Sequence, residues 1–263
     1  YNASAAGGTG GFDVGSNVTN VTLNGTTTAA GITTAAAGDW YTGTTWTGGV
    51  VPTNAENAIL KHFVTASAAI TRNSGTVTTI DATVGKLTMI GVTYTGNGAT
   101  NVNGTFQLDN GSWATSAPTG NYFSYGSAGT LNFNTTGNYN VFNSDVFWPP
   151  GATAPFNVNV LKGGINMINA SRTVAGVFSH ANTAPTPPVL GIQLTSSVLR
   201  INGSAIIYPG GFFTNAPVYG PASTLVYRPG GTYGRGTEWN AAGVGTIGTT
   251  PGYPNNVQIT NST

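Results

Sequence analysis

The chain of 263 residues contains no cysteine and few charged residues. Without cysteine it can form neither a disulfide framework nor a thiolate metal site. Charged residues make up 6% of the sequence, against roughly 25% in ordinary globular proteins. Because the net charge is only +1 and no basic stripe is present, we expect no nucleic-acid binding. No apolar run approaches the roughly 18 residues of a membrane helix, so we expect no membrane insertion.

Catalytic patterns are missing as well. The acidic residues are spread along the chain rather than clustered, as calcium binding or paired-carboxylate hydrolysis would require. They are Asp13, Asp39, Glu56, Asp81, Asp109, Asp145 and Glu238. His62 and His180 lie far apart, and neither an HExxH nor a GxSxG pattern occurs. We therefore predict that the protein is not an enzyme and holds no cofactor and no metal.

The polarity of the chain comes from Thr, Asn and Ser together with 39 glycines. These residues suit strands and tight turns and are poor helix formers, so the composition predicts an all-β protein. Short segments with apolar residues at every second position recur between Gly, Asn and Pro turns. They lie at 58–60, 69–71, 77–80, 86–90, 105–108, 130–133, 157–160, 198–201, 224–227 and 257–259.

An internal repeat helps to choose between the folds that such segments allow. YGSAGTLNFNTTGNY at 125–139 aligns without a gap with YGPASTLVYRPGGTY at 219–233. Trp148 and Trp239 follow at nearly the same offset, as do PFNVNV at 155–160 and PNNVQI at 254–259. The two copies therefore cover about 125–160 and 219–259. Each copy is too long for one coil of a solenoid and predicts several coils with an excursion.

We predict that residues 38–263 form a single elongated β-solenoid, most simply a right-handed parallel β-helix. Residues 1–37 form a Gly/Thr-rich segment in which NVTNVTLNG suggests one or two further strands. The alternative fold is a set of stacked β-sandwich modules, which would use the same short strands.

The stretch GDWYTGTTWTGGVVPT at 38–53 predicts a cap for the first coil. Trp40 and Trp46 can each cover about 200 Å² of apolar surface. Gly48 and Gly49 allow the chain to turn sharply, and Pro52 offers no backbone donor to a neighbouring strand. The competing interpretation makes the two tryptophans a platform on which sugars stack.

The same stretch, followed by KLTMIGVTYTGNGATNVNGTFQL at 86–108, resembles large secreted surface proteins of Bacteroidota. A second similar element is STLVY at 223–227 with the segments that follow it. The resemblance implies a right-handed parallel β-helix, export by type IX secretion and a surface-structural or adhesin-like role. Glu56 stands where these proteins more often carry Asp, and the carboxylate is retained.

We therefore expect a non-catalytic extracellular module of a cell-surface protein or surface filament, structural or adhesive in function. One alternative is a β-helix that binds or processes carbohydrate, with Trp113, Tyr219 and Trp239 as candidate contacts for a ligand or partner. The second is ice binding, although TTT, TVTTI and TYT share no period. Near Trp239, Arg235 and Glu238 are interpreted as a structural salt bridge beside a packed ring.

The expected partners are further segments of a longer chain or neighbouring copies, and surface glycans are a further possibility. The apolar strand at 257–259 is followed by no Trp-rich or charged cap. A solenoid that ends on such a strand leaves its core face and its edge unpaired. The pattern predicts that another segment of polypeptide or another molecule covers this strand.

Overall fold

The computed structural model describes residues 31–109, 113–114, 122–183, 190–240 and 245–260. The chain divides into two compact units, 1–30 and 31–263, and the described residues all belong to the second. The strands predicted within NVTNVTLNG lie outside the described residues. Residues 31–37 contain one strand of two residues, β1 (Ile32–Thr33).

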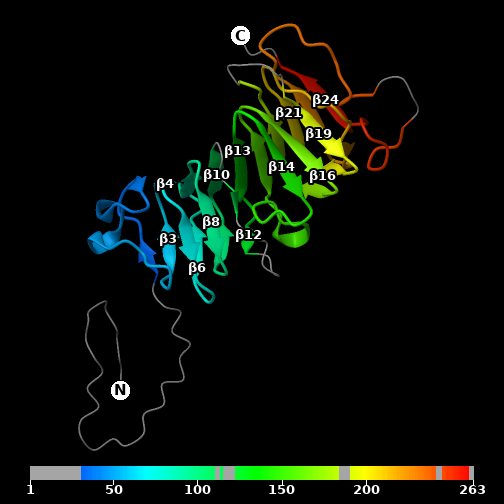
Figure 1. Cartoon of the computed structure of the whole chain (residues 1–263). Coiled ribbons are helices and arrows are strands. Elements are labelled where there is room, and N and C mark those ends of the chain that lie inside the picture. Colours follow the sequence, from blue (N-terminus) through cyan, green and yellow to red (C-terminus); the bar gives the residue numbers. More distant parts are fainter. Residues whose placement is uncertain (1–30, 110–112, 115–121, 184–189, 241–244, 261–263) are drawn as a thin grey trace, which may run out of the picture. The chain divides into compact units, whose positions relative to one another are not determined.

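The second unit is built from short strands in five sheets (Figure 1). The largest sheet has ten strands: β2 (Gly38–Asp39), β4 (Phe63–Ala66), β7 (Lys86–Met89), β10 (Thr105–Asp109), β13 (Thr130–Asn134), β15 (Asn157–Val160), β18 (Val177–His180), β21 (Ser204–Ile207), β23 (Thr224–Tyr227) and β24 (Asn256–Ile259). A five-stranded sheet contains β1 (Ile32–Thr33), β3 (Ala58–Leu60), β6 (Val77–Ile80), β9 (Ala99–Val102) and β12 (Phe123–Tyr125).

The remaining three sheets have three strands each. The first contains β5 (Ile70–Arg72), β8 (Thr93–Gly96) and β11 (Trp113–Ala114). The second contains β14 (Asn138–Phe142), β16 (Gly164–Ile168) and β19 (Ile192–Thr195), and the third β17 (Arg172–Val174), β20 (Leu199–Ile201) and β22 (Val218–Tyr219). Three short 3-10 helices lie outside the sheets: η1 (Gly43–Thr45), η2 (Thr47–Gly49) and η3 (Gly151–Thr153).

Every pairing between named strands of the described residues is parallel. The chain passes through three sheets in turn, as in β6, β7 and β8, and then pairs β9, β10 and β11 alongside them. We call one such circuit a coil. The all-β prediction is confirmed, and the parallel sheets are consistent with a β-solenoid. The alternative of stacked sandwich modules is wrong, because those modules are built from antiparallel sheets.

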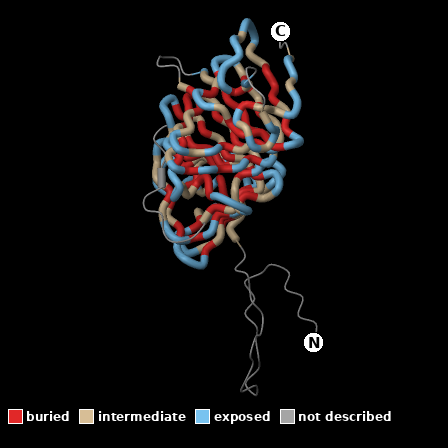
Figure 2. Tube along the Cα trace, turned by 90° about the vertical axis from the view of Figure 1, so that its right-hand side faces the viewer, coloured by how far each residue is buried: buried red, intermediate tan, exposed pale blue. Residues whose placement is uncertain are grey.

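The core consists of inward-facing columns that run from strand to strand across the ten-stranded sheet. In register, one column contains Val64, Leu87, Phe106, Leu131, Val158, Phe178, Ala205 and Leu225. All eight side chains are almost completely buried, and each Leu or Phe of this kind contributes about 1.5–3 kcal/mol. Figure 2 shows the buried residues gathered inside the coils and the exposed ones on their outside, and along the strands buried side chains alternate mainly with partly buried ones. The alternation in the sequence therefore reports which side chains face inward.

A second inward column lies two residues further along the same strands. In register, it contains Ala66, Met89, Leu108, Phe133, Val160, His180, Ile207, Tyr227 and Ile259. The members before Ile259 are buried, whereas Ile259 is 74% exposed. The column therefore ends, among the described residues, on an apolar side chain with its outer side uncovered.

The outer face of the ten-stranded sheet carries a ladder of polar side chains. The Asn132 amide donates to Gln107, the Asn159 amide donates to Asn132, and the Ser179 hydroxyl donates to Asn159 at 2.6 Å. These bonds satisfy side chains that lie directly opposite each other in the register. The outward column is mixed rather than threonine alone, so this sheet presents no repeated Thr-x-Thr lattice. That register disfavours the ice-binding alternative.

Candidate functional site

The two tryptophans of the first coils are core residues. Trp40 and Trp46 are 2% and 1% exposed, and their rings form a T-shaped pair with centroids 5.1 Å apart. The indole Nε1 of Trp46 donates to the Trp40 carbonyl at 2.6 Å, and the Arg72 guanidinium lies 5.7 Å from the Trp40 ring centroid. No ring face is left for a sugar. The structure therefore corrects the stacking-platform interpretation, and the packing agrees with a cap.

The backbone after these rings turns as the sequence predicted. Gly48 and Gly49 have φ angles of 74° and 72°, in the region that favours glycine, and Pro52 is buried. Arg72 then ties down the following loop by donating to the carbonyls of Thr53 and Glu56. The Glu56 carboxylate accepts the Thr53 N–H at 2.8 Å, and this backbone hydrogen bond lowers the pKa of Glu56. These contacts give the stretch a structural role.

The internal repeat places the same aromatic triad twice. In the first copy Phe133 lies 4.8 Å from Tyr139 and 6.1 Å from Trp148, measured between ring centroids. The second copy consists of Tyr227, Tyr233 and Trp239. The corresponding distances from Tyr227 are 5.3 Å to Tyr233 and 6.5 Å to Trp239. The aligned residues of the two sequence segments thus make the same contacts in space.

The first tyrosine of each copy makes an equivalent hydrogen bond. The Tyr125 hydroxyl donates to the carbonyl of Phe147, the residue before Trp148, at 2.7 Å. The Tyr219 hydroxyl donates to the carbonyl of Glu238, the residue before Trp239, at 2.9 Å. Each bond fixes the excursion that carries the tryptophan against the coil below it. Tyr219 is 0% exposed, so the expectation that it contacts a ligand was wrong.

Each excursion also contains one carboxylate, partly buried in the first copy and fully buried in the second. In the first copy Asp145 accepts the Trp148 N–H at 2.7 Å and the Tyr139 hydroxyl at 3.0 Å. Burial raises the pKa of Asp145, although both hydrogen bonds act in the opposite direction. The pKa of Tyr139 is raised well above its ordinary value, first by burial and then by Asp145.

In the second copy the carboxylate is Glu238, which is fully buried. It accepts the Tyr227 hydroxyl at 3.0 Å and the Gly236 N–H at 2.8 Å. Arg235 does not pair with it. Its guanidinium lies over the Trp239 ring, 5.6 Å from the centroid, which corrects the predicted salt bridge. Burial and then the Glu238 charge raise the pKa of Tyr227 and Tyr233.

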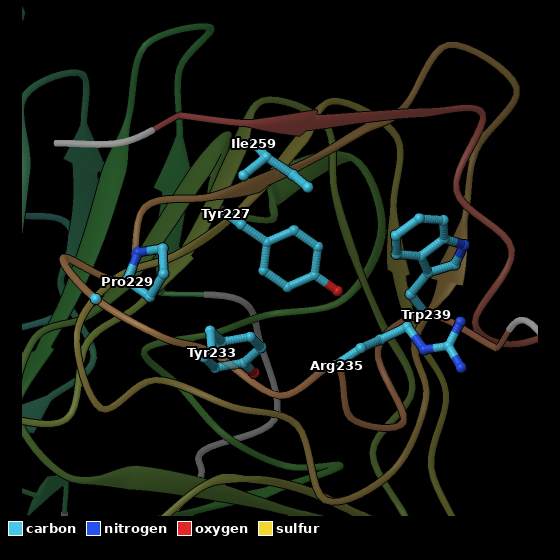
Figure 3. Close-up of a pocket in the computed structure, with 7 residues that line it drawn as sticks. Tyr227, Pro229, Tyr233, Arg235, Trp239 and Ile259 are labelled. Carbon is cyan, nitrogen blue, oxygen red and sulfur yellow. The ribbon is translucent and has the colours of Figure 1, made fainter.

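The second triad opens into a pocket of about 170 Å³. Its lining residues are Tyr227, Pro229, Gly231, Tyr233, Arg235, Trp239 and Ile259. Figure 3 shows the Tyr227 and Tyr233 rings side by side, with Ile259 above them and Arg235 and Trp239 at the far end. Trp239 was a sequence candidate. Tyr233 and Ile259 were not, although the repeat itself aligns them with Tyr139 and Val160.

The last candidate contact, Trp113, lies in β11, and its side chain is outside the description. The two histidines are hydrogen-bonded: His62 Nδ1 lies 2.9 Å from the Thr34 hydroxyl, and His180 Nε2 lies 2.9 Å from the Gly163 carbonyl oxygen. Within the described ranges no three His, Cys, Asp or Glu side chains come close enough to bind a metal. Across the same residues no helix has the length and apolar character needed to cross a membrane.

Comparison of the chain with family models gave no match, and comparisons with curated proteins and with solved structures gave none either.

Proposed function

We propose that the coils form one right-handed parallel β-helix that serves as a non-catalytic structural or adhesive module of a cell-surface protein or surface filament. One observation carries the proposal. A parallel ladder of ten strands runs from β2 to β24, with an apolar inner side and, from β10 to β18, a hydrogen-bonded polar outer side. Right-handedness follows from the strong preference of parallel crossover connections for that hand.

Such a ladder suits a load-bearing or spacer role. Each coil contacts mainly its two neighbours, so length can be added without a new core. The outer ladder joins successive strands through amide and hydroxyl groups such as those of Asn132, Asn159 and Ser179. These groups keep their partners when salt or pH changes, because they carry no charge. An exposed surface of this kind is compatible with the extracellular location that the resemblance to secreted Bacteroidota proteins also supports.

The carbohydrate alternative now rests on Trp239 alone among the described candidates, because Tyr219 is buried and the Trp113 side chain is not described. The carboxylates Asp145 and Glu238 belong to separate copies of the repeat, and each accepts a hydrogen bond from a tyrosine. They do not form the pair of facing carboxylates that glycoside hydrolysis needs. The structural or adhesive function is therefore the one we adopt.

Labelling of intact cells tests the proposal. An antibody raised against the second unit is applied to the producing cells before and after permeabilisation, with a cytosolic protein as the control. We expect full labelling without permeabilisation, and loss of cell attachment or of surface filaments when the gene is deleted. Labelling only after permeabilisation would overturn the surface role. Release of sugars from a polysaccharide panel by the purified chain would overturn the non-catalytic one.

A further inference from the structure

The two copies of the aromatic triad differ in what covers them. In the first copy, β14 carries Tyr139 and pairs in parallel with β16 of the next coil, so that Tyr139 lies opposite Ile165 and Val141 opposite Met167. Ile165 and Met167 are both 0% exposed. The following residues of the same coil bring Arg172, which donates to the Trp148 carbonyl at 2.7 Å. Trp148 is completely buried as a result.

In the second copy the equivalent cover is missing among the described residues. The segment 232–236 aligns with the start of β14, but it pairs with no named strand of the described ranges. Tyr139 and Tyr233 are both partly buried, but Trp239 is only partly buried where Trp148 is completely buried. Val160 lies opposite Phe133 in the register, and Ile259 lies opposite Tyr227 in the same way. Ile259 is nevertheless 74% exposed, whereas Val160 is 1% exposed.

We propose that the pocket around Tyr233, Trp239 and Ile259 is a docking site for one further coil of polypeptide. The occupant is a β-strand that pairs in parallel along 232–236 and places alternating apolar side chains over Tyr233, as Ile165 and Met167 do over Tyr139 and Val141. This inference goes beyond the proposed surface function, since it assigns a binding surface and the chemistry of what binds there.

The lining of the pocket favours a strand over other occupants. In the first copy a Gly-apolar-polar-apolar segment, Gly164–Ile168, pairs along the strand that carries Tyr139, and Phe133 and Trp148 are fully buried. A second copy of the chain would have to present its first coils, but those begin with two-residue strands and with Trp40 and Trp46 already buried. The second triad already has its own guanidinium over Trp239, from Arg235.

The chain itself supplies the probe. A labelled peptide with the sequence of residues 161–180, LKGGINMINASRTVAGVFSH, reproduces the coil that covers the first triad. We expect it to bind the full-length protein saturably, as measured by fluorescence anisotropy. Ile259→Asp should weaken binding at least about tenfold, because it puts a charge where the apolar strand would pack. Phe63→Asp is the matched control: Phe63 is 61% exposed on another strand of the same sheet, and binding should be unchanged.

A peptide in which the counterparts of Ile165 and Met167 are Asp should not bind. A second measurement covers the case in which a free peptide binds too weakly: the same twenty residues are fused after Thr263. The fusion should protect the backbone amides of 232–236 and 256–259 from hydrogen exchange, and Ile259→Asp should remove that protection.

Three results would overturn the proposal. The first is an absence of both peptide binding and amide protection in the fusion. The second is binding of a glycan to the chain that Ile259→Asp abolishes, which would assign the pocket to carbohydrate. The third is a dimer, seen by sedimentation, that Ile259→Asp dissociates. None of these results affects the cell-labelling experiment, so failure of this inference is distinguishable from failure of the surface function.

Discussion

The buried Trp46 side chain combines packing with a hydrogen bond, and both contributions can be measured. Trp46→Ala removes a 1% exposed indole from the core and leaves a cavity beside Trp40. We expect it to lower the free energy of unfolding by about 3–5 kcal/mol. Trp46→Phe should cost less, because it keeps most of the ring and loses mainly the bond to the Trp40 carbonyl.

Urea unfolding followed by circular dichroism gives both values. Val50→Ala is the control: Val50 lies in the same loop but is 55% exposed, so its truncation should change stability little. If Trp46→Ala and Val50→Ala cost the same, Trp46 does not hold the cap.

His180 is a second residue whose surroundings make a measurable prediction. Its Nε2 lies 2.9 Å from the Gly163 carbonyl, and its Nδ1 accepts the Phe212 N–H at 3.0 Å. The N–H that Phe212 donates to Nδ1 favours a neutral ring with the proton on Nε2. Burial lowers the pKa of His180 below its ordinary value of 6.5, although the carbonyls of Gly163 and Phe212 oppose the shift. The Phe212 carbonyl oxygen lies 3.1 Å from Nδ1.

The sign of the pH effect follows from that lowered pKa. Below pH 6.5 the unfolded chain takes up a proton on this residue that the folded chain does not. The stabilising contribution of neutral His180 is therefore complete above about pH 6.5 and is lost as the pH falls toward the folded pKa. The slope approaches about 1.4 kcal/mol per pH unit. We expect urea unfolding between pH 7 and pH 5 to show this loss and His180→Gln to flatten it; an equal slope in the variant would contradict the assignment.

At the scale of elements, the coil corners are the places where stacked turns of chain come closest. A Cβ added at Gly104 would lie 2.2 Å from the Gly85 carbonyl oxygen and 2.3 Å from that of Asp81. Both obstacles are backbone atoms, which cannot rotate away. Gly104→Ala should therefore lower the free energy of unfolding by about 1–3 kcal/mol or more. Gly137→Ala is the matched control, because nothing lies within 4 Å of its added Cβ. Thermal unfolding of the two variants measures the difference. A similar loss of stability in both would contradict the role of close backbone approach at Gly104.

Strands were predictable from the sequence because their period is local. The segments 58–60, 77–80, 157–160 and 224–227 match β3, β6, β15 and β23 residue for residue. Burial of every second side chain is written directly into such short segments. The repeat was also visible, because the tyrosine and tryptophan of each triad stand at matching positions.

The pocket was harder to predict, because it depends on what lies above a residue rather than on the residue. Tyr139 and Tyr233 occupy equivalent positions, but only Tyr139 has a paired strand beside it among the described residues. The burial of Tyr219 was hard to predict for the same reason. An aromatic residue flanked by glycine and valine reads alike in a surface contact and in a core, and its hydroxyl bond to the Glu238 carbonyl comes from a distant excursion.

At the scale of the second unit, stability is distributed along the ladder rather than concentrated in one centre. Each inner strand of the ten-stranded sheet pairs with two neighbours, so the free energy of folding is close to a sum of neighbour interfaces. The two ends of the ten-stranded sheet differ in how they are covered. At β2 the outer side is closed by Trp40 and Trp46, whereas at β24 Ile259 stays 74% exposed. Fraying should therefore begin at β24.

Charge contributes little to this sum, which leads to a prediction for the whole molecule. Only 6% of residues are charged and the net charge is +1. The cations with resolved roles donate to backbone carbonyls, as Arg72 and Arg172 do, or lie over a ring, as Arg235 does. Salt screens attraction and repulsion between exposed charges, and there is little of either to screen.

We therefore expect the free energy of unfolding to change by less than about 0.5 kcal/mol between 50 and 500 mM NaCl, measured by urea unfolding at pH 7. A much larger loss at high salt would mean that ion pairs hold the coils together. That result would contradict a fold stabilised by apolar columns inside and uncharged hydrogen-bond ladders outside.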